Sequence, residues 1–155
     1  MNFFDVFAND VLWVPLTAFL IAQVLKTAIN AAINRKFSIS RLFGDGGMPS
    51  GHSATVSALA TMVGFEAGFG TPLFAISVIF AIIVMHDAHG VRRETGKQAE
   101  SIISISHLLN EYFEEKNQVV KTEKLKVLVG HTPLQVIFGA LLGCVVAIFY
   151  CLVLK

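Results

Sequence analysis

Chemically versatile residues cluster at positions 46–53, which read GGMPSGHS and directly precede a run of small and apolar residues. Pro49 is tolerated at a helix start, and Ser50 can cap the helix that follows. The free backbone N–H groups of a helix start, together with the positive end of its dipole, attract tetrahedral anions. Gly51 allows close approach of the backbone, and the His52 imidazole can accept or supply a proton near neutral pH. The segment therefore predicts a phosphate-type site; an ordinary capped helix with an uninvolved histidine is the alternative.

Charged side chains that could act on the same anion stand at five further positions. Lys26 lies inside an apolar stretch, where a lysine is costly and usually faces a partner or a polar cavity, although it can also extend to the membrane surface. Arg92 and Arg93 carry planar guanidinium groups suited to phosphate oxygens, and Lys97 can add a point charge. The alternative is that these three residues face anionic lipid headgroups. Asp87 can pair with an arginine or orient an imidazole.

Other potential ligands do not form a specific pattern. His86 and His89 flank Asp87, but their spacing is not specific for a metal, and we predict no metal site and no cofactor. Cys144 and Cys151 share one apolar segment, where their spacing favours inert packing on one helical face over a disulfide or a metal site. The predicted chemistry is therefore carried by side chains and backbone groups of this chain.

The composition is that of an integral membrane protein. Apolar residues make up 54% of the 155 residues and charged residues 15%, and the mean hydropathy is +0.66. A chain of this length corresponds to one domain, which we assign to residues 1–155. The formal net charge of +1 gives no reason to expect a nucleic-acid partner. Asp5 and Asp10 stand where a removable signal peptide would carry basic residues, so none is expected.

Four apolar stretches, at about 11–33, 53–69, 72–85 and 133–154, predict an all-α bundle with about four membrane spans. A span needs roughly 20 residues, so the two middle stretches, which are joined by a tight turn, are interpreted as a short transmembrane hairpin. A buried hairpin in a soluble protein is the alternative. Small residues four positions apart predict close approach of helix backbones: Gly64 with Gly68, Gly139 with Gly143, and Ser53 with Ser57.

Basic residues predict which side of the membrane the candidate site faces. The connections at about 34–52 and 86–132 carry three and seven of the 12 Lys and Arg residues, and with four spans both connections lie on the same side. The positive-inside rule places that side in the cytoplasm and both termini outside, so we expect a site at the cytoplasmic face of the cell inner membrane. His107 lies in the longer connection and is interpreted as a surface residue. Apolar residues around it predict an interfacial amphipathic helix: Ile102, Ile105, Leu109, Tyr112 and Phe113.

The sequence at positions 49–52, PSGH, resembles the middle signature of the phosphatidic acid phosphatase type 2 superfamily, which includes lipid phosphatases and vanadium haloperoxidases. Positions 131–143, HTPLQVIFGALLG, resemble the segment that begins with the nucleophilic histidine of that superfamily. Positions 87–99, DAHGVRRETGKQA, resemble its divergent branch. The resemblance implies that His131 is a nucleophile and His52 a general acid. A histidine at the membrane interface without a catalytic role is the alternative for His131.

Several positions depart from the superfamily pattern. Ile33 stands where the first motif has an arginine after Lys26, and no serine precedes Arg92. An insertion also splits the third motif. Gln135 replaces the aspartate that supports the nucleophilic histidine, and a glutamine can accept a hydrogen bond but carries no charge. Asp87 and Glu94 are the two candidates to compensate for that loss.

Together these features predict a phosphatase that hydrolyses the phosphate ester of a membrane lipid or an isoprenoid. His131 would attack phosphorus, His52 would protonate the leaving oxygen, and Asp87 would support them. A non-catalytic phosphate or phospholipid binder, or a transport component, is the alternative from another class, and vanadate-dependent halide oxidation is a third. Self-association of the bundle is left open. Six residues are expected to hold the phosphate: Lys26, Ser50, Gly51, Arg92, Arg93 and Lys97.

Overall fold

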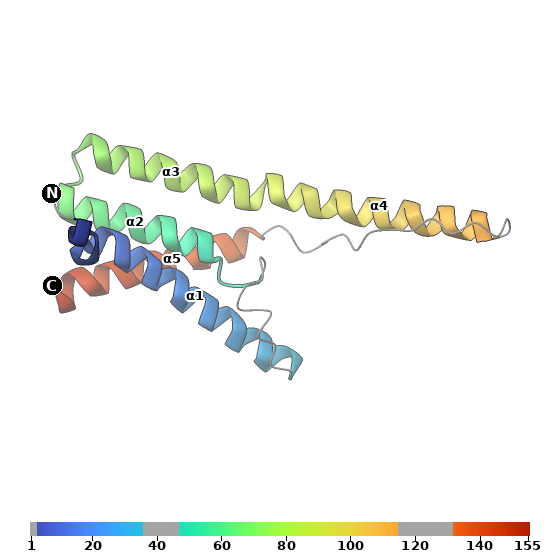
Figure 1. The fold of residues 1–155 in the computed structure, drawn as a ribbon, viewed down its shortest axis with the longest axis horizontal. Helices are drawn as coiled ribbons and strands as arrows, with labels where there is room; N and C mark the ends of the chain where they lie inside the picture. The colour runs from blue at the N-terminus through green and yellow to red at the C-terminus, as the bar shows by residue number, and fades with distance from the viewer. Residues whose placement is uncertain (1–2, 36–46, 115–131) are drawn as a thin grey trace.

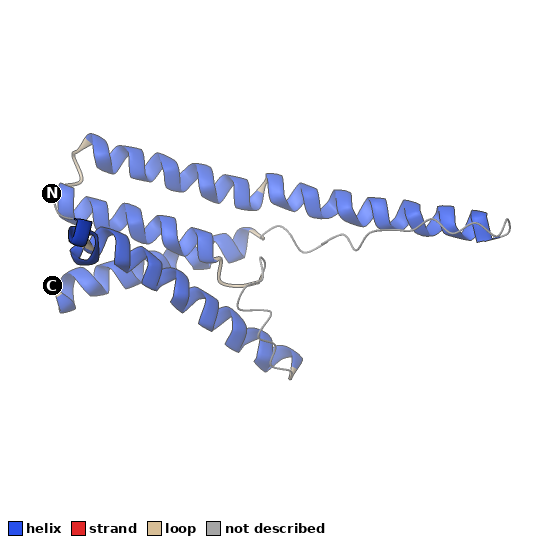
Figure 2. Ribbon diagram, viewed as in Figure 1, coloured by secondary structure: helices blue, strands red, loops and turns tan. Residues whose placement is uncertain are grey.

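The fold is a bundle of helices, as the computed structural model in Figure 1 shows for residues 3–35, 47–114 and 132–155. No strand occurs in these three ranges (Figure 2). The prediction of an all-α membrane bundle is therefore confirmed. The helices follow one another as η1 (Phe3–Ala8), α1 (Asp10–Asn34), α2 (Gly51–Ala67), α3 (Pro72–His89), α4 (Val91–Glu114), α5 (Pro133–Phe149) and a π-helical turn, η3 (Tyr150–Leu154).

Three helical stretches of the described chain are long and apolar enough to cross a membrane. They are Asp10–Ile33, Pro72–Leu109 and Pro133–Leu154. The remaining predicted span corresponds to α2, which has 17 residues and a length of about 26 Å, close to the lower limit for a span. Ten of the 17 residues of α2 are buried, against three of the 18 in α3, so α2 is the enclosed helix of the bundle.

Small residues allow α2 and α5 to pack closely. A Cβ atom on Gly139 would overlap the backbone of Ser50, and a Cβ atom on Gly143 would overlap that of Ala54. The predicted packing role of this glycine pair is therefore confirmed. The pair Gly64 and Gly68 serves the following turn instead, because a Cβ atom on Gly64 would overlap the ring of Phe69 and Gly68 ends α2 with a φ of +98°. The buried core beside the α2–α5 contact consists of Val14, Ala18, Ala58, Met62 and Ala147.

The third predicted span is longer than expected and leads directly into the amphipathic helix. The backbone N–H of Gly90 donates to the carbonyl of His86 at 2.7 Å, and that of Glu94 donates to the carbonyl of Gly90 at 3.1 Å. As a result α4 continues along the axis of α3 and extends beyond the other helices (Figure 1). Four large apolar residues of α4 are exposed, as expected of an amphipathic helix: Ile102, Ile105, Leu108 and Leu109.

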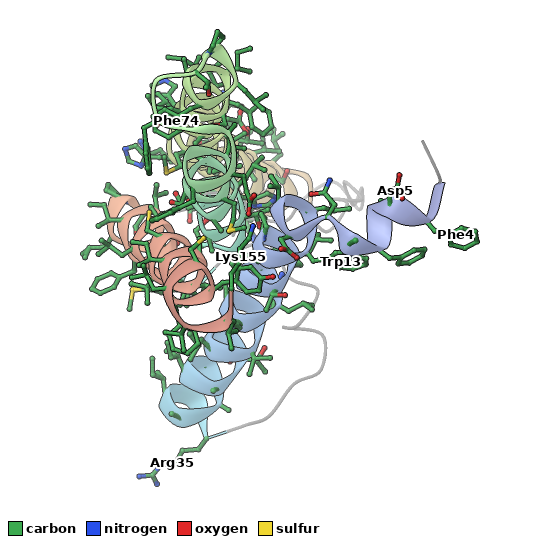
Figure 3. All side chains as sticks on the ribbon, turned by 90° about the vertical axis from the view of Figure 1, so that its left-hand side faces the viewer. Phe4, Asp5, Trp13, Arg35, Phe74 and Lys155 are labelled. Atoms are coloured by element: carbon green, nitrogen blue, oxygen red, sulfur yellow. The ribbon has the colours of Figure 1, made fainter. Side chains whose placement is uncertain are left out.

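A polar cluster joins the helix ends on the side of the bundle where both chain termini lie (Figure 1). Lys155, which lies centrally in the end-on view of Figure 3, forms an ion pair with Glu66 at the end of α2 and lies 4.0 Å from Asp10 at the start of α1. The hydrogen bond to Glu66 raises the pKa of Lys155. A cleft of about 360 Å³ opens beside these residues. The two termini share one end, as an even number of crossings requires.

We expect Gly143→Ala to lower the stability of the bundle by about 1–3 kcal/mol, because the new methyl group collides with the backbone of Ala54 and forces α5 away from α2. Thermal unfolding of the purified protein in detergent measures the effect. Gly70→Ala is the matched control, since a Cβ atom there meets nothing within 4 Å. Equal melting temperatures for the two variants would contradict the assigned packing.

Candidate phosphate-binding site

The start of α2 is built around Ser50, which is 0% exposed. Its hydroxyl accepts a hydrogen bond from the backbone N–H of Ser53 at 3.3 Å and lies 3.0 Å from the Ser53 hydroxyl. The predicted N-cap at Ser50 is therefore present. The backbone N–H of Ser50 also donates to the carbonyl of Gln135 at 3.0 Å, which fixes the first turn of α2 against the first turn of α5.

One face of α1 lies against the glycine-rich segment before and within this turn. A Cβ atom on Gly51 would lie 3.0 Å from the Phe19 ring and 3.9 Å from Nε2 of Gln23. A Cβ atom on Gly47, which has a φ of +99°, would lie 3.1 Å from Cγ and Cδ of Lys26. The two glycines thus let α1 side chains lie directly on the backbone of the motif.

Lys26 is the basic residue that the structure brings to this segment. It is only 6% exposed, although it lies in a membrane-spanning helix, and its aliphatic chain lies against Gly47. Lys26 therefore borders the glycine-rich segment that leads into Ser50 and Gly51, the cap and the first residue of α2. A lysine near a helix start adds its charge to the partial positive charge of the N–H groups there, which favours an anion over a cation or a neutral ligand.

One of the two predicted catalytic histidines, His52, lies in the described part of the chain. His52 is the second residue of α2 and is half-buried. His131 lies outside the described residues. The residue that follows it, Thr132, is the N-cap of α5, and α5 is the helix whose first turn binds Ser50.

Gln135 has a structural function at the position where the superfamily has an aspartate. Its Oε1 accepts a hydrogen bond from the Thr132 N–H at 3.1 Å, and its own N–H donates to the Thr132 hydroxyl at 3.4 Å. This is a capping box, and the sequence of a threonine with a glutamine three positions later predicts it. The carbonyl of Gln135 accepts from Ser50, so this residue links the starts of α2 and α5.

The remaining predicted residues lie near the junction of α3 and α4. Asp87 is half-buried in the last turn of α3, and His89 has its Nδ1 atom buried without a hydrogen-bond partner in the described chain. Arg92 and Arg93 stand in the first turn of α4, but their side chains are not described. Lys97 is exposed and forms an ion pair with Glu94 at 2.6 Å, so its charge is engaged on α4 itself. Within the described ranges, no three His, Cys, Asp or Glu side chains are grouped as for a metal ion.

Gln23 is a further polar residue beside the start of α2, and the sequence patterns alone do not identify it. It precedes Lys26 by one helical turn, and its Oε1 atom is buried with no hydrogen-bond partner among the described residues. The signal that could have revealed it is its spacing from Lys26, which places both side chains on one face of a helix.

The fold is that of a helical membrane protein, and the candidate site at the start of α2 lies at the end of the bundle opposite the termini (Figure 1). The chain belongs to the Divergent PAP2 family, whose sequence profile matches residues 7–146. It is 43% identical to YuiD, an uncharacterized membrane protein of Bacillus subtilis (strain 168), over 145 residues that make up 90% of this chain and 92% of that protein. No solved structure matches the chain. The predicted resemblance to the divergent branch is confirmed.

We expect Ser50→Ala to lower the stability by about 1–2 kcal/mol, because the variant loses the helix cap and leaves the hydroxyl of Ser53 without its buried partner. Ser101→Ala is the control, because the Ser101 hydroxyl makes a hydrogen bond on an exposed face, where it donates to the carbonyl of Lys97. There we expect a change of no more than about 0.5 kcal/mol. Thermal unfolding in detergent compares the melting temperatures of the two variants. Equal decreases in melting temperature would contradict the assignment of Ser50 as a stabilising cap of α2.

Proposed function

We propose that this protein is a phosphatase that hydrolyses the phosphate ester of a membrane lipid or an isoprenoid, at the cytoplasmic face of the cell inner membrane. The observation that carries the proposal is the buried Lys26 side chain lying against Gly47 at the capped start of α2. A buried lysine beside a helix start adds to the positive potential of the backbone N–H groups there, and this potential attracts an anion. Membership of the Divergent PAP2 family supports phosphate as that anion.

In the proposed reaction the phosphate group is held by Lys26 and by the backbone N–H groups that begin at Gly51. His131 attacks phosphorus and forms a phosphohistidine, while His52 gives a proton to the oxygen of the leaving alcohol. Water then attacks the phosphohistidine and releases inorganic phosphate, and His52 takes a proton from that water.

The other predicted residues take supporting roles in this proposal. Arg92 and Arg93 supply guanidinium groups for the phosphate oxygens, and Asp87 orients an imidazole or one of these arginines. Lys97 can contribute only if it leaves its ion pair with Glu94. Its substitution should therefore affect turnover less than that of Lys26.

A second candidate is a phosphate or phospholipid binder without turnover. The observation that favours it is the capping box, because Gln135 uses its side-chain oxygen to accept from the Thr132 backbone and supplies no charge to a neighbouring histidine. Without that charge a positively charged imidazole or a phosphohistidine is less stabilised. The binder would keep the anion site around Lys26 and lose only the reaction.

We expect His52→Ala and His131→Ala each to reduce phosphate release by about 100-fold or more, the usual contribution of a proton-transfer or nucleophilic side chain. The assay measures inorganic phosphate released from phosphatidic acid and from an isoprenoid phosphate in detergent micelles. His107→Ala is the matched control, because His107 is an exposed residue of α4 and its loss should leave turnover unchanged.

Binding of vanadate, a phosphate mimic, separates the two candidates. The phosphatase releases phosphate and loses vanadate affinity in Lys26→Met. The binder releases none from either substrate yet shows the same loss of affinity. If wild-type protein neither releases phosphate nor binds vanadate, both candidates are wrong.

A further inference from the structure

Gln23 presents an amide oxygen for which the described part of the chain offers no partner. Its Oε1 atom is buried and has no hydrogen-bond partner among the described residues. Buried polar atoms in native proteins are almost always paired, because leaving one unpaired is unfavourable. An exception at a ligand site is expected where the ligand supplies the missing partner.

The position of the side chain points to such a ligand. The Gln23 amide comes to the first turn of α2, with its Nε2 atom 3.9 Å from where a Cβ atom of Gly51 would lie. Lys26 lies one turn further along α1 and contacts the neighbouring Gly47. Gln23 therefore borders the same small region as the cation and the helix start that form the candidate phosphate site.

The hydrogen-bonding character of Gln23 differs from that of the groups around it. The Lys26 ammonium and the N–H groups at the start of α2 can only donate hydrogen bonds. The Gln23 Oε1 can only accept one. A ligand that contacts all of them must offer acceptor oxygens to the donors and at least one donor to the Gln23 Oε1.

A phosphate group that carries a proton has this combination. Inorganic phosphate bears at least one P–OH group near neutral pH, and a phosphomonoester bears one in its monoanionic form, since its second pKa is about 6. A phosphodiester anion and sulfate offer only acceptors. They would leave the Gln23 oxygen unpaired, and such a mismatch in a buried site discriminates strongly between ligands.

We propose that Gln23 is a specificity-determining residue whose Oε1 accepts a hydrogen bond from the P–OH group of a bound phosphate or phosphomonoester. This inference rests on the phosphate site of the proposed function. It adds that the site prefers a phosphate group with a proton over sulfate or a phosphodiester. It also gives a reason for the unpaired amide oxygen of Gln23 in a membrane-spanning helix. Binding sites often contain groups that lower the stability of the protein without its ligand.

The test measures the affinities of inorganic phosphate and of sulfate for the purified full-length chain in detergent, by calorimetry at pH 7. Gln23→Met keeps the length of the side chain and removes both polar atoms, and Gln23→Leu is a second apolar replacement. We expect phosphate affinity to fall about ten-fold in both variants while sulfate affinity changes by less than two-fold. The melting temperature of the empty protein should stay the same or rise. Gln98→Met, the same change on an exposed face of α4, should leave all three quantities unaltered.

Two results would overturn the inference while leaving the site intact. One is an equal loss of phosphate and sulfate affinity in Gln23→Met, which would make the amide a general ligand without selectivity. The other is a lower melting temperature with an unchanged ratio of affinities, which is the signature of a packing residue. Wild-type protein that binds neither anion, or binds both independently of Lys26, would instead refute the proposed site itself, and the selectivity of Gln23 with it.

Discussion

The contact between the first turns of α2 and α5 is the constraint on which the candidate site depends. Gly139 and Gly143 let the two backbones meet, and the Ser50 N–H to Gln135 carbonyl hydrogen bond fixes their register. With this register, the motif that starts at Pro49 lies beside the motif that leads into α5. Residues some eighty positions apart in the chain are thereby joined through backbone groups, which do not depend on the conformation of a flexible side chain.

The same contact involves two residues that also stabilise the starts of helices. Ser50 caps α2 and is also part of the phosphate motif, and Gln135 caps α5 where relatives of the superfamily are expected to have an aspartate. A capping glutamine and an aspartate at this position serve different needs, because the glutamine stabilises the helix start without contributing charge. In this chain the side chain at position 135 therefore stabilises the start of α5.

Much of the fold was accessible from the sequence because the signals were local. The apolar stretches that begin at about 72 and 133 predicted where α3 and α5 begin, and the glycines at 139 and 143 indicated their packing role. The end of α3 and its continuation into α4 were not predicted, because the apolar pattern ends before the polar residues His86 and Asp87. In the structure Gly90 keeps helical hydrogen bonds on both sides.

The site was predictable in its motif but not in its surroundings. Lys26, Ser50 and Gly51 were identified by type and spacing, and in the structure Lys26 borders Gly47, in the segment that leads into Ser50 and Gly51. The unpaired Oε1 atom of Gln23 was not predicted. Whether this atom has a partner among the described residues depends on the packing of neighbouring helices, which the spacing of residues in a sequence does not reveal. Lys97 looked equally suitable as a ligand in sequence, yet its partner Glu94 is one turn away on its own helix.

The depth of Lys26 has a consequence for how any molecule reaches it. The residue lies about two turns before the end of α1 at Asn34, which corresponds to about 12 Å along the helix axis. A solute arriving from water must cover that distance along α1 from the helix end. Access to Lys26 should therefore depend on the thickness of the bilayer. A thinner membrane brings the water boundary closer to Lys26, and a thicker membrane moves it further away.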